Sequence, residues 1–387
     1  MYPRRFWIER ILSAWQRRSV VWLKGVRRVG KTVLARSLPG IEYFDCELPR
    51  TRRDMEDPEA FLRSLQGRAA VLDEVHRLPA PSELLKIAAD HFPSTKILAT
   101  GSSSLSATAD FADTLTGRKE EVWLTPMVLA DLVAFERPSL ERRMLRGGLP
   151  PFFLSEELPE RDFQEWLDAF WAKDILELFR LRQRRPFLRF VELLLLNSGG
   201  IFEATSYARP CEVSRTTISN YLDVLETTLV AHVIRPFSRR PRAEIVSAPK
   251  VYGFDTGFVC YLNGWEQLRP DDKGTLWEHI VLNELQAHLP VGAKIRYWRT
   301  KHGNEVDFVL QRRGGEPVAI ECKWSADGLD ASDLRVFRRH YAGGETYVVA
   351  HDVTRPLERE IAGVTLTIIS LEDLVRRIAA ERPTPGI

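Results

Sequence analysis

The stretch that decides the fold is VVWLKGVRRVGKTVLARSL, residues 20–38. It opens with an apolar run typical of a buried strand, passes through a turn bounded by Gly25 and Gly30, and ends in a segment with helical pattern. The turn fits Gly-x-x-x-x-Gly-Lys-Ser/Thr between a strand and a helix, the setting that a phosphate-binding loop requires. These residues predict a nucleotide-binding site.

Each residue type in this loop suits contact with phosphate. Glycine lets the backbone approach phosphate oxygens closely, and the amides that start the next helix favour the same negative charge. We expect the lysine to reach the β and γ phosphates of ATP and the threonine hydroxyl to ligate Mg²⁺. The predicted nucleotide-binding residues are Gly25, Val26, Arg27, Arg28, Val29, Gly30, Lys31 and Thr32.

A second apolar run supports the first. AAVLDEV, residues 69–75, reads as a buried strand that ends in two acids and resembles the Walker B element of the AAA+ class. We expect Asp73 to hold the Mg²⁺ shell and Glu74 to polarise the attacking water, which makes Glu74 the candidate catalytic acid.

Two further positions are candidates for contact with bound nucleotide. The strand KILATGSSS, residues 96–104, runs into a polar turn where Thr100 or Ser102 is placed to sense the γ-phosphate. Arg118, in LTGRKEEVWL, is a candidate arginine finger on the nucleotide of its own chain or of a neighbour, or else an ordinary surface arginine. Five apolar runs with helical segments between them predict a doubly wound parallel sheet over residues 1–128.

Composition and length restrict the class of protein. A chain of 387 residues exceeds the roughly 250 to 300 at which one core stops growing, so two or three domains are expected. Four scattered cysteines without a C-x-x-C pair signal neither a disulfide framework nor a zinc site. No apolar run approaches the roughly 18 residues of a membrane span, and the opening MYPRRFWIERIL lacks the apolar core of a secretory signal. We therefore expect a cytoplasmic protein with no membrane partner.

The middle of the chain is predicted to be helical and then to form a winged helix-turn-helix. Residues 129–200 read as a helical lid or linker whose apolar side chains belong to the core. The arginines near them are expected to form a solvated helix face, and phosphate binding is the second interpretation. The predicted core positions are Trp166, Phe170, Ile175, Leu178 and Leu181, and the arginines are Arg180, Arg182, Arg184, Arg185 and Arg189.

In residues 201–255, Ser214 is a plausible N-cap of a recognition helix whose buried face carries Ile218, Leu222 and Leu225. Its exposed start, residues 215–220, has side chains that suit phosphates and bases, although such units also serve only for packing. The wing arginines Arg239, Arg240 and Arg242 are candidates for minor-groove contact, so DNA is the expected partner.

The last part, residues 256–387, reads as a small α/β domain with the order helix, three strands, helix, two strands, helix. It contains NEVDFVLQRRGGEPVAIECKWS, residues 304–325. Strand alternation places Asp307, Glu321 and Lys323 on one face and apolar residues on the other, and a Gly-Gly turn brings the two acids nearly opposite. Such carboxylates repel unless a cation lies between them, and Mg²⁺ suits them. Lys323 is then placed to orient a water or stabilise the phosphorane, with Glu278 as a further ligand. The alternative is a purely structural amphipathic hairpin with its polar face in water.

The spacing of Asp307 and Glu321-Cys-Lys323 resembles the PD-(D/E)xK restriction-endonuclease-like superfamily, which includes archaeal Holliday-junction resolvases. That resemblance implies a nuclease-like site of Glu278, Asp307, Glu321 and Lys323 that uses Mg²⁺ or Mn²⁺. The proline that names the motif is absent here, since the aspartate lies in EVDF, but proline is not a ligand.

The whole chain resembles a family of prokaryotic AAA+ ATPases with a C-terminal domain of long-unassigned function. The resemblance rests on GVRRVGKT, LDEVHRLP, TGSSS, LTGR, FDTGF, LWEHIVLNEL, YWRTKHGNEVDFVL and AIECKWS, in that order. It implies ATP binding and a nuclease-like domain, and a homo-oligomer is possible because AAA+ relatives often form rings. We expect an ATP-hydrolysing protein whose nuclease-like domain acts on DNA. The alternatives are a nucleotide-switched regulator with a catalytically silent domain and, third, a toxin-like effector.

Overall fold

The computed structural model describes residues 2–101, 113–137, 139–179, 181, 183–238, 248–290, 293–311 and 315–380. The chain folds into two compact units. The first unit comprises residues 1–140, 147–188 and 222–230, and the second comprises residues 141–146, 189–221 and 231–387. Within the described ranges, no helix combines the length and the hydropathy needed to cross a membrane.

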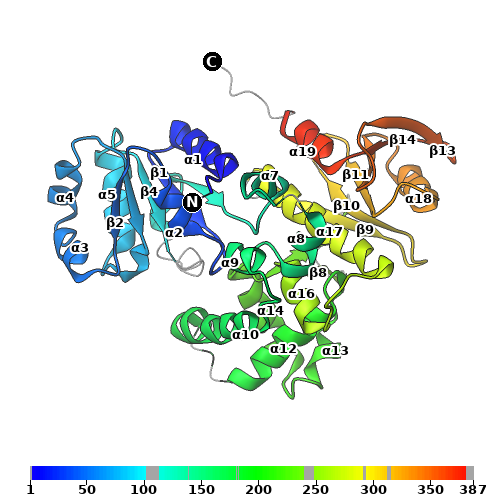
Figure 1. Ribbon diagram of the computed structural model, residues 1–387, viewed down its shortest axis with the longest axis horizontal. Helices are drawn as coiled ribbons and strands as arrows, with labels where there is room; N and C mark the ends of the chain where they lie inside the picture. The colour runs from blue at the N-terminus through cyan, green and yellow to red at the C-terminus, as the bar shows by residue number, and fades with distance from the viewer. Residues whose placement is uncertain are drawn as a thin grey trace. The chain divides into compact units, whose positions relative to one another are not determined.

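The first unit is built on a five-stranded parallel sheet with the order β2-β3-β4-β1-β5 (Figure 1). Its strands are β1 (Val20–Lys24), β2 (Glu42–Asp45), β3 (Ala70–Asp73), β4 (Ile97–Thr100) and β5 (Lys119–Trp123). The described residues of β3 and β4 are all buried, as expected for a parallel sheet covered on both faces. All five predicted strands and their parallel arrangement are confirmed.

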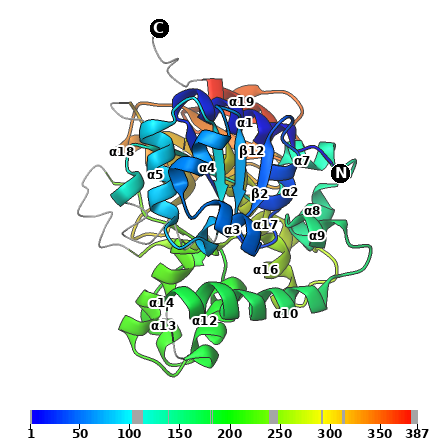
Figure 2. The same cartoon turned by 90° about the vertical axis from the view of Figure 1, so that its left-hand side faces the viewer.

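Helices pack on both faces of this sheet. Helices α4 and α5 cover the face that carries Trp22 and Leu72, and Figure 2 shows both beside the strands. Helix α1 contacts β1 and β5, and α2 contacts β3 and β4. The helices of this part are α1 (Arg5–Arg17), α2 (Lys31–Arg36), α3 (Pro49–Asp54), α4 (Pro58–Ser64), the short 3₁₀ helix η1 (Val75–Arg77) and α5 (Pro81–His91).

The segment predicted as a helical lid is helical, with one irregular turn. Trp166, Phe170 and Ile175 are buried as predicted, and Leu181 is half-buried. The side chain of Leu178 lies outside the described part of the chain, as do Arg180 and Arg182. The elements are α7 (Leu129–Ala134), α8 (Leu140–Arg146), α9 (Pro150–Leu154), α10 (Glu160–Ala169), the π-helix η3 (Phe170–Ile175), α11 (Leu176–Phe179) and α12 (Arg184–Leu196).

Two helices joined by a short connection and a small antiparallel sheet follow, and the winged-helix interpretation of them stays a prediction. The elements are β6 (Gly200–Ile201), α13 (Ala204–Ala208), α14 (Arg215–Thr227), β7 (Ala231–Ile234) and β8 (Lys250–Gly253), with sheet order β6-β8-β7. Ser214 Oγ accepts the Thr217 N–H at 3.1 Å, which confirms the predicted cap. The side chains of Arg215, Ser219 and Asn220 are exposed at the start of α14. The predicted wing arginines Arg239, Arg240 and Arg242 fall outside the described residues.

The rest of the second unit is a six-stranded mixed sheet with the order β13-β14-β12-β11-β10-β9. Its elements are α16 (Thr256–Leu262), α17 (Pro270–His288), β9 (Ile295–Arg299), β10 (Glu305–Leu310), β11 (Val318–Lys323), α18 (Ser332–His340), β12 (Thr346–Ala350), β13 (Leu357–Ile361), β14 (Val364–Ile369) and α19 (Leu371–Ala380). Strand β13 was not predicted, because its residues are mostly exposed and show no apolar alternation. It pairs with β14 through a turn at Ala362 and Gly363, both with positive φ.

The predicted placement of Asp307 beside Glu321 agrees with the register of β10 and β11, but neither face of β10 lies in water. Every residue of β10 except Glu305 is buried, because α17 contacts β11 and α18 contacts β10. Val306 and Val309 belong to the same apolar cluster although their sequence separation is odd. The pairing with β9 shifts register between these two residues, which accounts for the change of face.

Two buried histidines make the second unit sensitive to acid. Burial first, and then the neighbouring His279, lower the pKa of His232, in β7, to about 3. Because the unfolded chain takes up this proton near the ordinary value of 6.5, the stability contribution is complete above pH 6.5 and is lost as the pH falls toward 3. We expect the unfolding temperature to fall between pH 7.5 and 4.5, and His232→Phe to flatten that slope. His302→Gln, on an exposed turn, is the matched control. An unchanged slope in His232→Phe would contradict this assignment.

Candidate functional site

The phosphate-binding loop owes its path to two glycines with different roles. Gly30 has φ of 100° and Arg28 has φ of 62°, so the loop turns through the left-handed region. At Gly25, a Cβ would lie 2.5 Å from the backbone oxygen of Leu124, just after β5. Gly25 is therefore required by packing against the backbone, in addition to any approach of phosphate.

The loop lysine lies in a cavity of about 600 Å³. Lys31 Nζ donates to Gly25 O at 2.7 Å and to Val26 O at 3.2 Å. Burial lowers the pKa of Lys31. Residues that line the cavity include Gly25, Arg27, Arg28, Gly30, Lys31, Thr32 and Glu74. The predicted loop and the predicted catalytic acid thus meet at one cavity.

Asp73 and Thr100 contact each other at the ends of β3 and β4. The Thr100 hydroxyl donates to Asp73 Oδ1, and the Tyr43 hydroxyl donates to Asp73 Oδ2. Thr100 Oγ1 also accepts the Glu74 N–H at 3.1 Å. Thr100, one of the two predicted phosphate sensors, is thus engaged with the two acids, and Ser102 lies outside the described residues.

The carboxylate of Glu74 is held in its charged form. Burial alone would raise the pKa of Glu74, but the hydrogen bond from His76 and the positive charges of Lys31 and Arg27 outweigh burial and lower it. His76 Nδ1 lies 3.1 Å from Glu74 Oε2. An ionised carboxylate on the wall of this cavity is suited to polarise a water.

Side chains from the helical segment hold the loop in place. Asp174 Oδ2 lies 3.1 Å from Arg27 Nε, and Trp166 Nε1 donates to Arg27 O at 3.0 Å. Arg4 donates to Val29 O at 2.9 Å. Asp174 lies in the π-helix η3, an irregularity that is frequent at functional sites. Sequence patterns do not single out any of these contacts, because their partners are distant in the chain.

Asp174 forms an ion pair with the loop arginine Arg27 at the cavity wall, so we expect its removal to free Arg27 for phosphate and to strengthen nucleotide binding. Asp174→Asn keeps the shape of the side chain but removes a negative charge from the wall of an anion-binding cavity. We expect ATP to bind about three- to tenfold more tightly, measured by fluorescence titration with a labelled ATP analogue. Asp168→Asn, on an exposed position of α10, is the control. Weaker binding by Asp174→Asn would show that the carboxylate supports the nucleotide.

Arg118 is not brought to this cavity. Its Nε lies 2.8 Å and 3.0 Å from the two carboxylate oxygens of Asp90, near the end of α5. This ion pair is half exposed at the surface of the first unit. Contact of Arg118 with the nucleotide of a neighbouring chain stays a prediction.

The acids of the second unit lie side by side on paired strands. Phe308 pairs with Ile320, so the residues just before and after them, Asp307 and Glu321, are adjacent across the two strands. Asp307 Oδ2 accepts the Cys322 N–H at 2.8 Å, and Lys323 Nζ lies 2.9 Å from Glu321 Oε1. Glu321 Oε2 is buried and has no hydrogen-bond partner among the described residues.

Both carboxyl groups resist ionisation. Burial raises the pKa of Asp307 well above its ordinary value, and the charges of Glu278 and Glu321 add to this effect. Burial likewise raises the pKa of Glu321, although Lys323 opposes the rise. Two buried acids that are costly to charge together provide oxygen ligands for a cation, and Mg²⁺ commonly uses one or two carboxylates.

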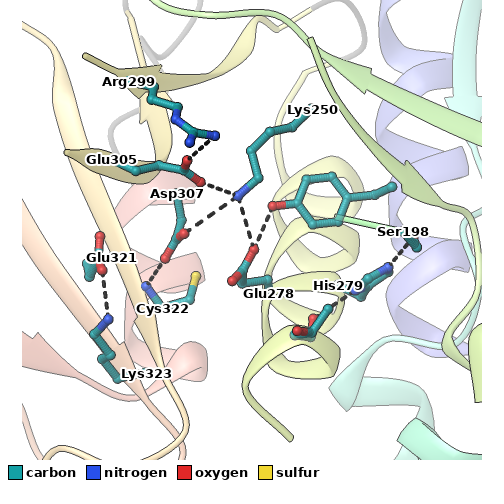
Figure 3. Close-up of polar contacts among 12 residues, drawn as sticks. Ser198, Lys250, Glu278, His279, Arg299, Glu305, Asp307, Glu321, Cys322 and Lys323 are labelled. Atoms are coloured by element: carbon teal, nitrogen blue, oxygen red, sulfur yellow. Dashed lines mark hydrogen bonds and ion pairs between the residues drawn. The ribbon is translucent and has the colours of Figure 1, made fainter. Parts of the chain in front are cut away.

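Glu278 lies near these acids but is engaged elsewhere (Figure 3). Its Oε2 accepts a hydrogen bond of 2.7 Å from the Tyr252 hydroxyl and lies 3.4 Å from Lys250 Nζ. Lys250 also contacts Glu305. Among the described residues, no group of three or more His, Cys, Asp or Glu side chains is arranged to hold a metal ion. Sequence reasoning missed Lys250 and Tyr252, whose strand, β8, lies far from the acidic hairpin in the chain.

Three family models match the chain in succession: an AAA domain over residues 17–133, and two domains of unknown function, DUF8612 over residues 137–269 and DUF4143 over residues 273–371. The first match agrees with the phosphate-binding loop and the parallel sheet. The first unit therefore contains an ATPase-like AAA domain of the P-loop class. The two other models carry no assigned function, so the division into four predicted domains and the nuclease-like interpretation stay predictions.

Two mycobacterial proteins resemble most of the chain. Uncharacterized protein Rv2008c of Mycobacterium tuberculosis and Uncharacterized protein Mb2031c of Mycobacterium bovis are each 30% identical over 336 residues, which covers 84% of this chain and 74% of each relative. The chain belongs to the family of these two proteins. Among solved structures, the Walker-type ATPase of Pyrococcus abyssi matches with 16% identity and a TM-score of 0.42, over 68% of this chain and 96% of that one.

Proposed function

We propose that the protein binds Mg²⁺-ATP in the cavity of the first unit and hydrolyses it. The observation that carries this proposal is that Lys31, Thr32 and an ionised Glu74 line the same cavity. Lys31 binds the β and γ phosphates, Thr32 and Asp73 hold the magnesium shell, and Glu74 polarises the attacking water.

Nucleotide binding is tested by the thermal stability of the purified chain with ATP, ADP or AMP in Mg²⁺. Because the loop recognises the β-phosphate, ATP and ADP should raise the unfolding temperature and AMP should not. Equal effects of ADP and AMP would overturn this assignment of the loop.

A second candidate function is a metal-dependent nuclease-like activity of the second unit. It is supported by Glu321 Oε2, which lies buried beside Asp307 without a hydrogen-bond partner in the described part of the chain, and by Lys323, which contacts the other oxygen of the Glu321 carboxylate. Asp307 and Glu321 would hold the Mg²⁺ or Mn²⁺, which supplies charge stabilisation at a phosphodiester and lowers the pKa of a bound water. Lys323 would orient that water or stabilise the phosphorane.

DNA is the proposed substrate or partner. The exposed side chains of Arg215, Thr216, Ser219 and Asn220 on α14 support contact with phosphates and base edges. If the nuclease-like domain is silent, the protein is instead a nucleotide-switched regulator that binds DNA or protein without cutting.

The decisive assay incubates the protein with branched, duplex and single-stranded DNA plus Mg²⁺ or Mn²⁺, with and without ATP. Cleavage that Asp307→Ala abolishes, and that Asp327→Ala on an exposed position retains, supports the nuclease. Equal cleavage by wild type and Asp307→Ala overturns it. Binding that depends on nucleotide, without any cut, supports the regulator.

A further inference from the structure

Lys250 places a positive charge in the middle of the acidic cluster of the second unit. Its Nζ lies 2.6 Å from Glu305 Oε1, 3.4 Å from Glu278 Oε2 and 3.9 Å from Asp307 Oδ1 (Figure 3). The three acids come from α17 and β10, and the lysine comes from β8. The Lys250 side chain is only 6% exposed. One buried ammonium thus contacts three carboxylates.

The geometry suits an ammonium group. Lysine has three N–H donors and no acceptor, which matches three acceptors around one point. The shortest contact, 2.6 Å from Lys250 Nζ to Glu305 Oε1, is a short charge-assisted hydrogen bond, still longer than the roughly 2.0 to 2.1 Å of a bond from Mg²⁺ to oxygen. The Tyr252 hydroxyl donates to the same oxygen of Glu278 that faces Lys250, so this oxygen already has two protein partners.

The two ends of this acidic cluster therefore differ in whether a protein cation already contacts the carboxylates. At one end, Glu278 and Glu305 face Lys250. At the other end, Glu321 Oε2 is buried and has no partner among the described residues, and Asp307 lies between the two ends. A buried carboxylate oxygen without a donor is costly, so Glu321 Oε2 is the oxygen of this cluster that gains most from an added cation.

We propose that Lys250 is a resident cation that takes the place of a divalent ion at the Glu278 and Glu305 end of the cluster. A divalent ion then binds only at the end formed by Asp307 and Glu321, and Glu278, which the sequence predicts as a metal ligand, is a partner of Lys250. This inference deepens the proposed nuclease-like site, but it concerns the number and position of cations and not DNA cleavage.

Replacing the lysine should create a metal site that wild type lacks. Lys250→Met removes the charge but keeps an unbranched apolar side chain, and it leaves Glu278, Glu305 and Asp307 facing one another. Repulsion among these acids favours a divalent ion. With the nucleotide omitted, we expect Lys250→Met to bind one more Mn²⁺ per chain than wild type, counted by electron paramagnetic resonance of free Mn²⁺. Lys250→Arg, which keeps the charge, and Lys294→Met, at an exposed position, should not gain an ion.

Two further variants assign the gained ion. Adding Glu278→Gln to Lys250→Met should weaken the gained Mn²⁺ by about tenfold or more, whereas Glu278→Gln alone should leave Mn²⁺ binding of wild type unchanged. If Lys250→Met unfolds without metal, Mn²⁺ should restore its folded state and raise its unfolding temperature more than that of wild type. A Lys250→Met chain that neither gains an ion nor is stabilised by Mn²⁺ overturns the inference, as does loss of wild-type Mn²⁺ binding in Glu278→Gln.

The readout separates this inference from the proposed nuclease. If wild type binds no Mn²⁺ and Lys250→Met binds one, Lys250 does take the place of a divalent ion, but the cation site at Asp307 and Glu321 is wrong and the metal-dependent nuclease is lost with it. If wild type binds one Mn²⁺ through Asp307 and Glu321 and cleaves no DNA, the resident cation again stands and only the nuclease fails.

Discussion

Glu74→Gln should bind ATP as wild type does and release phosphate about 100-fold more slowly or worse, a typical loss for a general base. The amide keeps the size of the side chain but cannot take up negative charge or accept a proton. The amide oxygen of the glutamine can still accept the hydrogen bond from His76, so the fold should persist. The measurement is single-turnover phosphate release together with ATP binding by titration.

The matched control for this change is Glu83→Gln, at an exposed position of α5. It should hydrolyse ATP at the wild-type rate. If Glu74→Gln also retained the wild-type rate, another residue would have to polarise the water. The role assigned to Glu74, the acid that follows β3, would then be wrong.

Lys31→Ala should weaken ATP binding by about 100-fold and abolish measurable hydrolysis, because it removes the ammonium expected on the β and γ phosphates. The change should not unfold the chain. Burial lowers the pKa of Lys31, which means that the charged side chain is costly where no phosphate balances it. We therefore expect the unfolding temperature without nucleotide to equal or exceed that of wild type.

Lys86→Ala, at an exposed position of α5, is the control for Lys31→Ala. Tight ATP binding by a folded Lys31→Ala chain would show that the loop is not the phosphate site. A large drop in stability without nucleotide would instead contradict the cost assigned to the buried ammonium.

The first unit was predictable because its signals are local. Each strand is a short apolar run, and the loop and its lysine are read from eight consecutive residues, Gly25–Thr32. The sequence did not reveal the second reason why position 25 must be glycine. A side chain there would clash with the backbone oxygen of Leu124, which is distant in the sequence. The same holds for Asp174, which reaches Arg27 from a π-helix whose extra residue per turn breaks the helical spacing.

In the second unit, the order of helices and strands was largely predictable, but the burial of both faces of its strands was not. Alternation separates polar from apolar residues only where one face of a sheet meets water, and β10 is buried on both. The adjacency of Asp307 and Glu321 followed from the hairpin register. The position of Lys250 did not, because β8 precedes the hairpin by more than fifty residues in sequence and no local pattern links them.

The central claim is that the cavity of the first unit hydrolyses ATP. The most direct measurement is steady-state phosphate release from ATP by the wild-type chain, with and without Mg²⁺, beside the Lys31→Ala Glu74→Gln double variant. We predict release that requires Mg²⁺ and that the double variant reduces to the rate of a solution without protein. Equal release by both chains, or none from a folded wild type that binds ATP, would contradict the claim.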